Sequence, residues 1–204
     1  MKKTFINQAQ IKKELLDLTK ELIQFRTTSD NARAFISCMD YIKKFFAKAG
    51  LPIILNEYIS NGRPSLVITS RKTKQPKVFL VGHIDVVEAP VQAFRPKIKN
   101  GKLFGRGALD MKSGLAIAII AFRETVKKNP LCDIGLMIVS DEEVGGFNGV
   151  GFLLGKKAYS ASFATVLEGA VEARITHKQK GVCQVKVSVE GVSGHGAYPW
   201  LGEN

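Results

Sequence analysis

The stretch that most constrains the fold is the apolar run 78–87, which contains a histidine and a carboxylate two residues apart. Its β-branched and aromatic residues, without polar alternation, predict a strand buried on both faces, as in parallel sheets. Residues i and i+2 of an extended segment point the same way, so His83 and Asp85 share a side. Two interpretations are open here: a metal-binding His83 whose ring is held by Asp85, or an ordinary polar strand end.

Further buried strands and helices follow in alternation. Residues 134–140 and 163–167 have the composition of buried strands, while 115–128 predicts a largely buried helix and 150–157 a short one. This order predicts an α/β fold with a mostly parallel, doubly wound sheet. Ahead of it we expect two amphipathic helices and a β-hairpin, namely a helix at 11–25, a helix capped at 29–31 and ended by Gly50, and strands at 52–59 and 65–69.

Two other segments differ in composition from these alternating strands and helices. Residues 88–108 form a long polar excursion with a small hairpin at Asn100-Gly101, and a long loop directly after a candidate ligand is more often functional than idle. After Glu172, residues 173–178 and 181–190 predict antiparallel strands with one solvated face. We therefore expect one domain at residues 1–172 and the beginning of a smaller α+β domain at 173–204.

The composition narrows the class of protein. The formal net charge is +12, but the lysines are spread over helix faces and turns without basic aromatic stripes, so we expect no nucleic-acid partner. The longest apolar stretch, 115–122, is too short to cross a bilayer, and no apolar signal-peptide core follows the N-terminal lysines. We expect a cytoplasmic protein without a membrane partner. The three cysteines lack CxxC spacing and predict buried free thiols.

Carboxylates follow the other predicted strands. Glu142 and Glu143 come after the strand at 134–140, Glu168 after the strand at 163–167, and Asp110 precedes the buried helix. Each has an ordinary alternative: a helix N-cap for Asp110, a solvated loop for the acidic pair and a surface carboxylate for Glu168. However, the carboxyl ends of parallel strands share one sheet edge, so these groups are expected to converge with His83.

Such a set suits hydrolytic metal chemistry. One histidine with several carboxylates and few thiols fits Zn²⁺ or Mn²⁺. A carboxylate such as Asp110 can bridge two ions that activate a water. Glu142 and Glu143 point in different directions, so one can coordinate while the other acts as a general base.

Four motifs occur in this order: 82–86 (GHIDV), 105–114 (GRGALDMKSG), 140–146 (SDEEVGG) and 194–204 (GHGAYPWLGEN). Together they resemble the co-catalytic zinc amidohydrolases and metallopeptidases. That family includes acetylornithine deacetylase, succinyl-diaminopimelate desuccinylase, aminoacylase and glutamate carboxypeptidase. The resemblance implies a zinc-exopeptidase-like catalytic domain at 1–172 and the start of a lid and dimerisation domain at 173–204. It also implies two Zn²⁺ per active site, with Co²⁺ or Mn²⁺ as possible substitutes.

The resemblance assigns a role to each matching residue. The metal ligands it implies are His83, Asp110 as the bridge between the ions, Glu143 and Glu168. Asp85 stands behind His83, and Glu142 is the general base. His195 lies in the lid domain and, in dimeric members, reaches the partner's site to stabilise the oxyanion. The alternative for His195 is a histidine of a glycine-rich loop.

The implied function is hydrolysis of an amide bond in N-acyl amino acids or small peptides, by metal-activated water with Glu142 as base, in a homodimer formed through the lid domain. The rivals are a dipeptidase or aminopeptidase of the same family, an inactive truncated relative that acts as a binding module, and a basic nucleic-acid binder. Family members are longer and supply one more metal-binding histidine downstream. The chain therefore resembles an amino-terminal portion, and His177, in the connection to the lid, is not expected to be that missing ligand.

Overall fold

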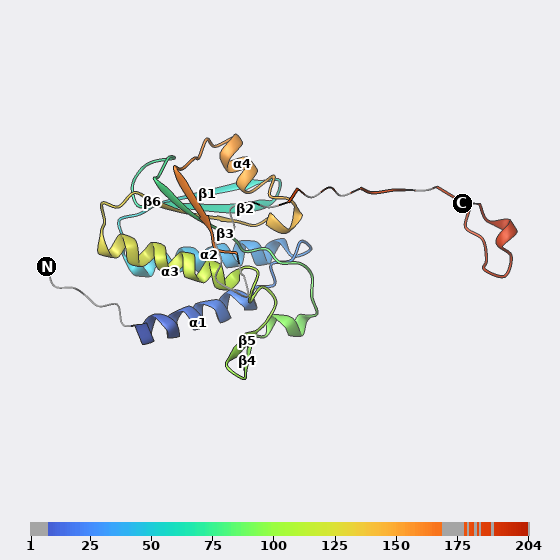
Figure 1. Cartoon of the computed structure of the whole chain (residues 1–204), viewed down its shortest axis with the longest axis horizontal. Coiled ribbons are helices and arrows are strands. Elements are labelled where there is room, and N and C mark those ends of the chain that lie inside the picture. Colours follow the sequence, from blue (N-terminus) through green and yellow to red (C-terminus); the bar gives the residue numbers. More distant parts are fainter. Residues whose placement is uncertain are drawn as a thin grey trace. The chain divides into compact units, whose positions relative to one another are not determined.

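The computed structural model describes residues 8–168, 178, 180, 181, 183, 185–188 and 190–203. The chain divides into two compact units, Met1–Val171 and Glu172–Asn204. The first unit contains a five-stranded sheet in the order β1-β2-β6-β3-β7 (Figure 1). The strands are β1 (Ile54–Ser60), β2 (Arg63–Thr69), β3 (Val78–His83), β6 (Ile134–Val139) and β7 (Phe163–Val166).

Four of the five strands run in one direction. β3 is parallel to both β6 and β7, whereas β2 is antiparallel to both β1 and β6. β2 is therefore the one reversed strand of this sheet, a consequence of the tight hairpin that joins it to β1. The prediction of a mostly parallel α/β sheet is confirmed.

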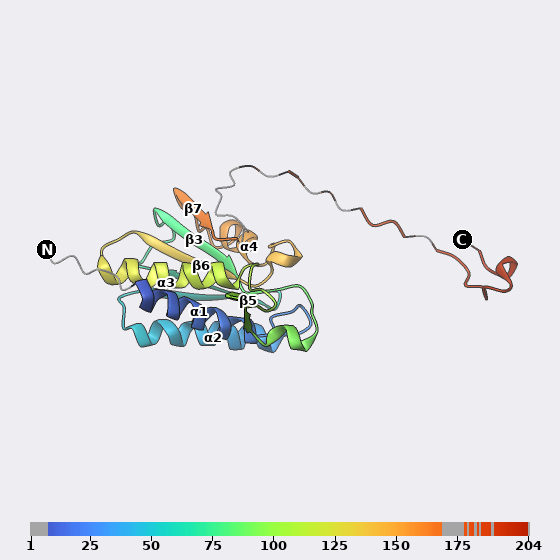
Figure 2. The same cartoon turned by 60° about the horizontal axis from the view of Figure 1, so that its bottom comes forward.

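Helices cover both faces of the sheet, as a doubly wound fold requires. Figure 2 shows α1 (Gln8–Gln24), α2 (Ala32–Ala49) and α3 (Lys112–Lys128) on one face and α4 (Val150–Gly155) on the other. The larger core lies under the first three helices, where Leu22, Phe46 and Phe122 are fully or almost fully buried. A smaller core packs Leu153 of α4 against Phe79 and Met137 on the opposite face.

Local signals in the sequence account for the element ends. Asn31 caps α2 by accepting a hydrogen bond from the Ala34 amide, and Gly50 closes the helix with φ at 61°. The small hairpin is formed by β4 (Lys97–Lys99) and β5 (Lys102–Phe104), after the 3₁₀ turn η1 (Val91–Phe94). Its turn places Asn100 and Gly101 at positive φ, which these residues tolerate.

The structure corrects three expectations about these elements. β3 ends at His83 rather than Val87, because the following backbone bonds elsewhere: the Val86 amide donates to the Thr27 carbonyl at 3.0 Å. α3 begins three residues before the expected start at 115. β7 is not a buried strand: it lies at the sheet edge with Phe163 62% exposed.

The second unit has little regular structure in its described part. The backbone of Val192 pairs with that of Glu203, and η3 (Pro199–Leu201) forms a short turn between them. The strands expected at 173–178 and 181–190 are not formed by the residues described there, and residues 173–177, with His177, lie outside the described part. In the described residues, no helix has the length and apolar character needed to cross a membrane.

Candidate metal centre

The strand register explains why the predicted residues meet. Val81 on β3 pairs with Val166 on β7, and the same register carried two residues further sets His83 opposite Glu168. On the other side, His83 pairs with Val139 at the end of β6, just before the loop that carries Glu142. Asp110 arrives from the loop before α3. Parallel strands that end at one edge therefore explain the positions of His83, Glu142 and Glu168, and the loop before α3 adds Asp110.

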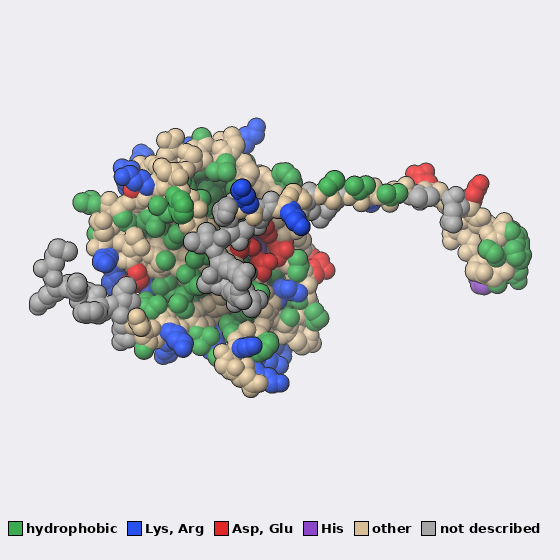
Figure 3. All heavy atoms as spheres, viewed as in Figure 1, with side chains coloured by type: hydrophobic (Ala, Val, Ile, Leu, Met, Phe, Trp, Pro, Cys, Tyr) green, Lys and Arg blue, Asp and Glu red, His purple; other side chains and the backbone are tan. Residues whose placement is uncertain are grey.

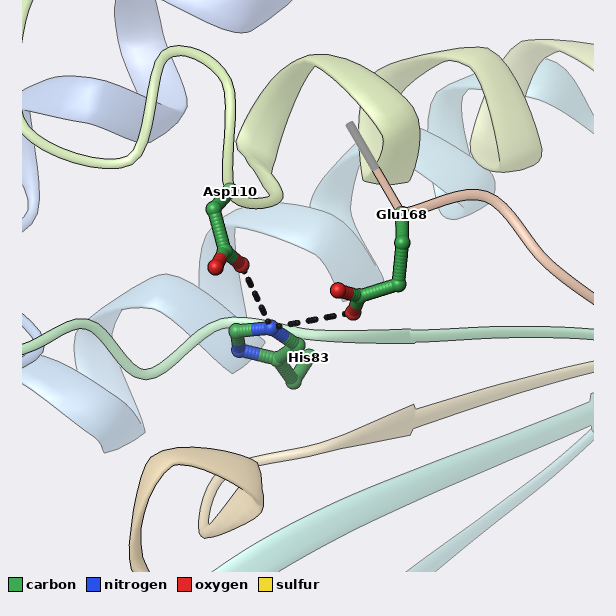
Figure 4. Close-up of side chains that lie close together, drawn as sticks. All are labelled: His83, Asp110 and Glu168. Atoms are coloured by element: carbon green, nitrogen blue, oxygen red, sulfur yellow. Dashed lines mark hydrogen bonds and ion pairs between the residues drawn. The ribbon is translucent and has the colours of Figure 1, made fainter. Parts of the chain in front are cut away.

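Three side chains converge closely. His83 Nε2 lies 3.1 Å from Asp110 Oδ1 and 3.5 Å from Glu168 Oε1 (Figure 4). One ligand atom of each residue lies within 4.8 Å of the other two. The imidazole is buried, while the two carboxylates are about half exposed, and Figure 3 shows acidic side chains gathered in one patch of this face. The site is thus open to solvent on its acidic side.

Asp85 holds the other side of the imidazole ring. His83 Nδ1 lies 2.9 Å from the Asp85 carbonyl oxygen, its hydrogen-bond partner, and 3.2 Å from Asp85 Oδ1. Because Nδ1 faces only acceptors, it carries the proton, and in the neutral ring the Nε2 lone pair points at Asp110 and Glu168. Asp85 Oδ2 also accepts a hydrogen bond from the Glu143 amide at 2.9 Å. This buried carboxylate therefore connects the histidine to the acidic loop.

The crowding of carboxylates perturbs the pKa values of the site. Burial by itself lowers the pKa of His83, but the hydrogen bond and charge of Asp85, with the charges of Glu142 and Glu168, outweigh it and raise the pKa to about 9. The pKa values of Glu143 and Glu168 are raised, first by burial and then by the charge of Asp110. In the absence of a metal ion, a proton on His83 is thus strongly favoured.

These residues fit a divalent cation. Ligands about 2.1 Å from one tetrahedral ion are separated by about 3.4 Å, close to the two separations measured from Nε2. Nitrogen with two carboxylates is a donor set suited to Zn²⁺ or Mn²⁺. The carboxylate behind His83 supplies the outer partner that orients metal-binding histidines. The arrangement can hold an ion that polarises a carbonyl group.

The two glutamates of the acidic loop lie differently. They open the 3₁₀ turn η2 (Glu142–Val144), and Glu142 Oε2 lies 3.8 Å from His83 Nε2. Glu143 is fixed through its amide, and its carboxylate is outside the converging triad. The assignment of Glu142 as base and Glu143 as ligand stays a prediction.

His195 belongs to the second unit and is described there by itself. Its Nδ1 accepts a hydrogen bond from the Ala197 amide at 3.2 Å, and its ring centroid lies 5.9 Å from that of Tyr198. Both of these contacts come from residues of the same local turn. Its role toward an oxyanion stays a prediction.

The sequence reasoning gave no role to the residues that support the site. Met111 Sδ accepts a hydrogen bond from the His83 amide at 3.3 Å. Met111 is also the N-cap residue of α3, so Asp110 is not that cap. Lys112 is fully buried and donates to the Phe25 carbonyl at 2.7 Å, and burial lowers its pKa to about 8. A lysine directly before the apolar run 115–122 is the signal that could have drawn attention to it.

Comparisons with known proteins show which family and fold this chain resembles. A family model described as peptidase family M20/M25/M40 matches residues 79–203. A succinyl-diaminopimelate desuccinylase of Thioalkalivibrio sulfidiphilus is 33% identical over 94% of this chain and 53% of its own, and a probable carboxypeptidase of Arthroderma gypseum is 31% identical over 94% and 44%. The chain thus spans about half the length of these relatives. The structure of an M20 family metallo-carboxypeptidase, Sso-CP2 from Sulfolobus solfataricus, matches with a TM-score of 0.60 at 22% identity, covering 77% of this chain and 37% of that one.

Proposed function

Because the chain belongs to peptidase family M20/M25/M40, we propose that it provides the metal-binding site of a hydrolase that cleaves an amide bond in an N-acyl amino acid or a small peptide. The observation that carries this proposal is the Nε2 atom of His83 facing two carboxylates at 3.1 and 3.5 Å. The other ring nitrogen, Nδ1, is hydrogen-bonded to Asp85. Nε2 is therefore the ring atom that is available to an ion.

Each residue contributes a separate function. His83, Asp110 and Glu168 hold the ion, which we propose to be zinc, and Glu143 contributes to a second metal position. When bound, the metal supplies Lewis-acid polarisation of the scissile carbonyl and activates water. Glu142 receives the proton of the attacking water and delivers it to the leaving amine. Asp85 keeps the imidazole in the orientation and tautomer that leave Nε2 free.

The substrate class follows from the relatives. One is named a desuccinylase and another a probable carboxypeptidase, so acyl amino acids and peptides with a free carboxylate are the substrates to test first. A dipeptidase or aminopeptidase activity is the second candidate. We further propose that the active form is a homodimer in which His195 stabilises the developing oxyanion.

Paired substitutions test this assignment. Glu142→Gln is expected to abolish hydrolysis of N-succinyl and N-acetyl amino acids while bound zinc persists, whereas Glu143→Gln lowers the zinc content. Glu57→Gln is the matched control, because its carboxylate is as exposed as that of Glu142, 55% against 53%, and belongs to β1. Zinc is measured by atomic absorption and turnover by amine release.

The outcomes separate the alternatives. Loss of zinc in Glu142→Gln would show that base and ligand are assigned the wrong way round. Faster cleavage of dipeptides than of acyl amino acids favours the peptidase. Zinc binding without turnover on either substrate set favours a binding module.

A further inference from the structure

A pocket with a polar lining lies in the segment that connects Asp85, the residue that orients His83, to the metal ligand Asp110. There η1 and the β4–β5 hairpin border an open surface cavity of about 430 Å³. This volume is within the usual range of small-molecule sites. The Arg106 amide donates to the Ala93 carbonyl at 2.7 Å, so the hairpin is tied to η1 and the two walls are held together.

The lining of this cavity is cationic. Arg95, Lys97 and Arg106 line it, and no Asp or Glu does. Within the described part of the chain, none of these three cations has a carboxylate within ion-pair distance. Among the residues that the structure describes, Arg106 Nε is buried without a hydrogen-bond partner, and Arg106 Nη2 donates to the Glu88 carbonyl at 3.5 Å. Figure 3 shows Lys and Arg side chains around this hairpin.

Three lining cations that lack a carboxylate partner among the described residues favour an anion at this cavity. The planar guanidinium group of an arginine matches the oxygens of phosphate or carboxylate. Phosphate monoesters carry a charge of about −1.5 to −2 at neutral pH, so they balance three cations better than a single carboxylate does. Phe104 also lines the cavity and is 52% exposed, which offers a ring face to a flat organic group.

We propose that this cavity binds a small organic phosphate monoester, with the phosphate on Arg95, Lys97 and Arg106 and the organic group on Phe104. The site uses residues 92–106 and none of the metal ligands. It is therefore independent of the hydrolase proposed above and remains open to test if that function is wrong.

Titration calorimetry on the intact zinc-loaded protein tests the proposal with phenyl phosphate, inorganic phosphate and benzoate as probes. Phenyl phosphate should bind most tightly. Lys97→Gln and Arg106→Gln should each weaken its Kd at least about tenfold, since each removes a charged hydrogen-bond donor. Lys99→Gln is the matched control, because Lys99 lies on the same strand but outside the lining, and it should leave Kd within twofold. Phe104→Ala should remove the advantage of phenyl phosphate over inorganic phosphate.

The metal site is the competing location for a phosphate, so Asp110→Asn is included. Phenyl phosphate binding retained in Asp110→Asn and weakened in Lys97→Gln supports the cavity. Binding lost in Asp110→Asn but unchanged in Lys97→Gln and Arg106→Gln places the phosphate on the metal and overturns the proposal. Tighter binding of benzoate than of phenyl phosphate overturns the choice of ligand, and no binding of any probe overturns the site.

Discussion

Gly114 allows the close contact that brings Glu168 to the candidate metal centre. It lies in the first turn of α3, and a Cβ built on it would stand 1.8 Å from the carbonyl oxygen of Leu167, the residue before Glu168. Gly114→Ala therefore forces the two backbones apart by at least about 1.2 Å to reach the shortest contact that real side chains show. Neither backbone is the flexible end of a side chain, so the displacement cannot be absorbed by a rotamer change.

We expect two measurable effects from this displacement. Overpacking costs about 1–3 kcal/mol of unfolding free energy, measured by urea denaturation in a chelator. Metal–ligand distances tolerate a change of only about 0.2 Å. Zinc affinity should therefore fall about 10–100-fold, measured by competition with a chromophoric chelator.

Gly155→Ala is the control for the substitution itself. A Cβ at Gly155 meets nothing within 4 Å, so both quantities should stay near the wild-type values. Gly114→Ala with unchanged zinc affinity and an unchanged denaturation midpoint would refute the role assigned to this contact.

Three further predictions concern the core and the titrating groups. Phe122→Ala should lower the unfolding free energy by about 3–5 kcal/mol in urea titrations, because its fully buried ring packs edge-on against Phe46 at 5.7 Å; a loss below about 1 kcal/mol would contradict this packing. Cys38 is buried and its pKa is raised to about 12, so at pH 8 mass spectrometry should find maleimide on the exposed Cys183 and not on Cys38 until urea is added. The metal-free protein should lose stability as pH rises from 6.5 toward 8, because the folded pKa of His83 is raised from 6.5 to about 9 and its proton favours the folded state most at low pH. The predicted range ends at pH 8 because the lowered pKa of Lys112 makes stability rise with pH above that value. If the unfolding free energy of His83→Asn falls with pH as steeply as that of the wild type, His83 is excluded as the cause.

The elements of the fold could be predicted where local signals decide them. The caps of α2 and the hairpin turn at Asn100-Gly101 depend on side chains and φ values that the sequence displays directly. The end of β3 could not be predicted, since it depends on Thr27, which lies far away in the chain. Thr27 donates to the Ile84 carbonyl through its hydroxyl and accepts a hydrogen bond from the Val86 amide. The exposure of β7 likewise depends on its place at the sheet edge, and an apolar run of four residues does not reveal that place.

The meeting of His83 and Glu168 could be predicted because both residues stand where parallel strands end at one sheet edge. Asp110 joins them from the loop before α3, whose course the strand pattern does not specify. The supporting residues are different. Met111 and Lys112 act through a sulfur contact and a buried amine whose partners, the His83 amide and the Phe25 carbonyl, are 28 and 87 residues away. No pattern within one segment specifies such pairs.

The charge of the chain and the charge of its site have opposite signs. The chain has 30 basic and 18 acidic residues, yet Asp85, Asp110, Glu142 and Glu168 lie around one imidazole, which acquires a raised pKa as a result. Gathering carboxylates raises the free energy of the folded state unless a cation compensates for their repulsion. A protonated His83 supplies one positive charge, whereas a divalent ion supplies two and leaves the imidazole neutral, as ligation requires. The acidic patch is therefore better explained by metal binding than by solubility, which the basic remainder of the chain already provides.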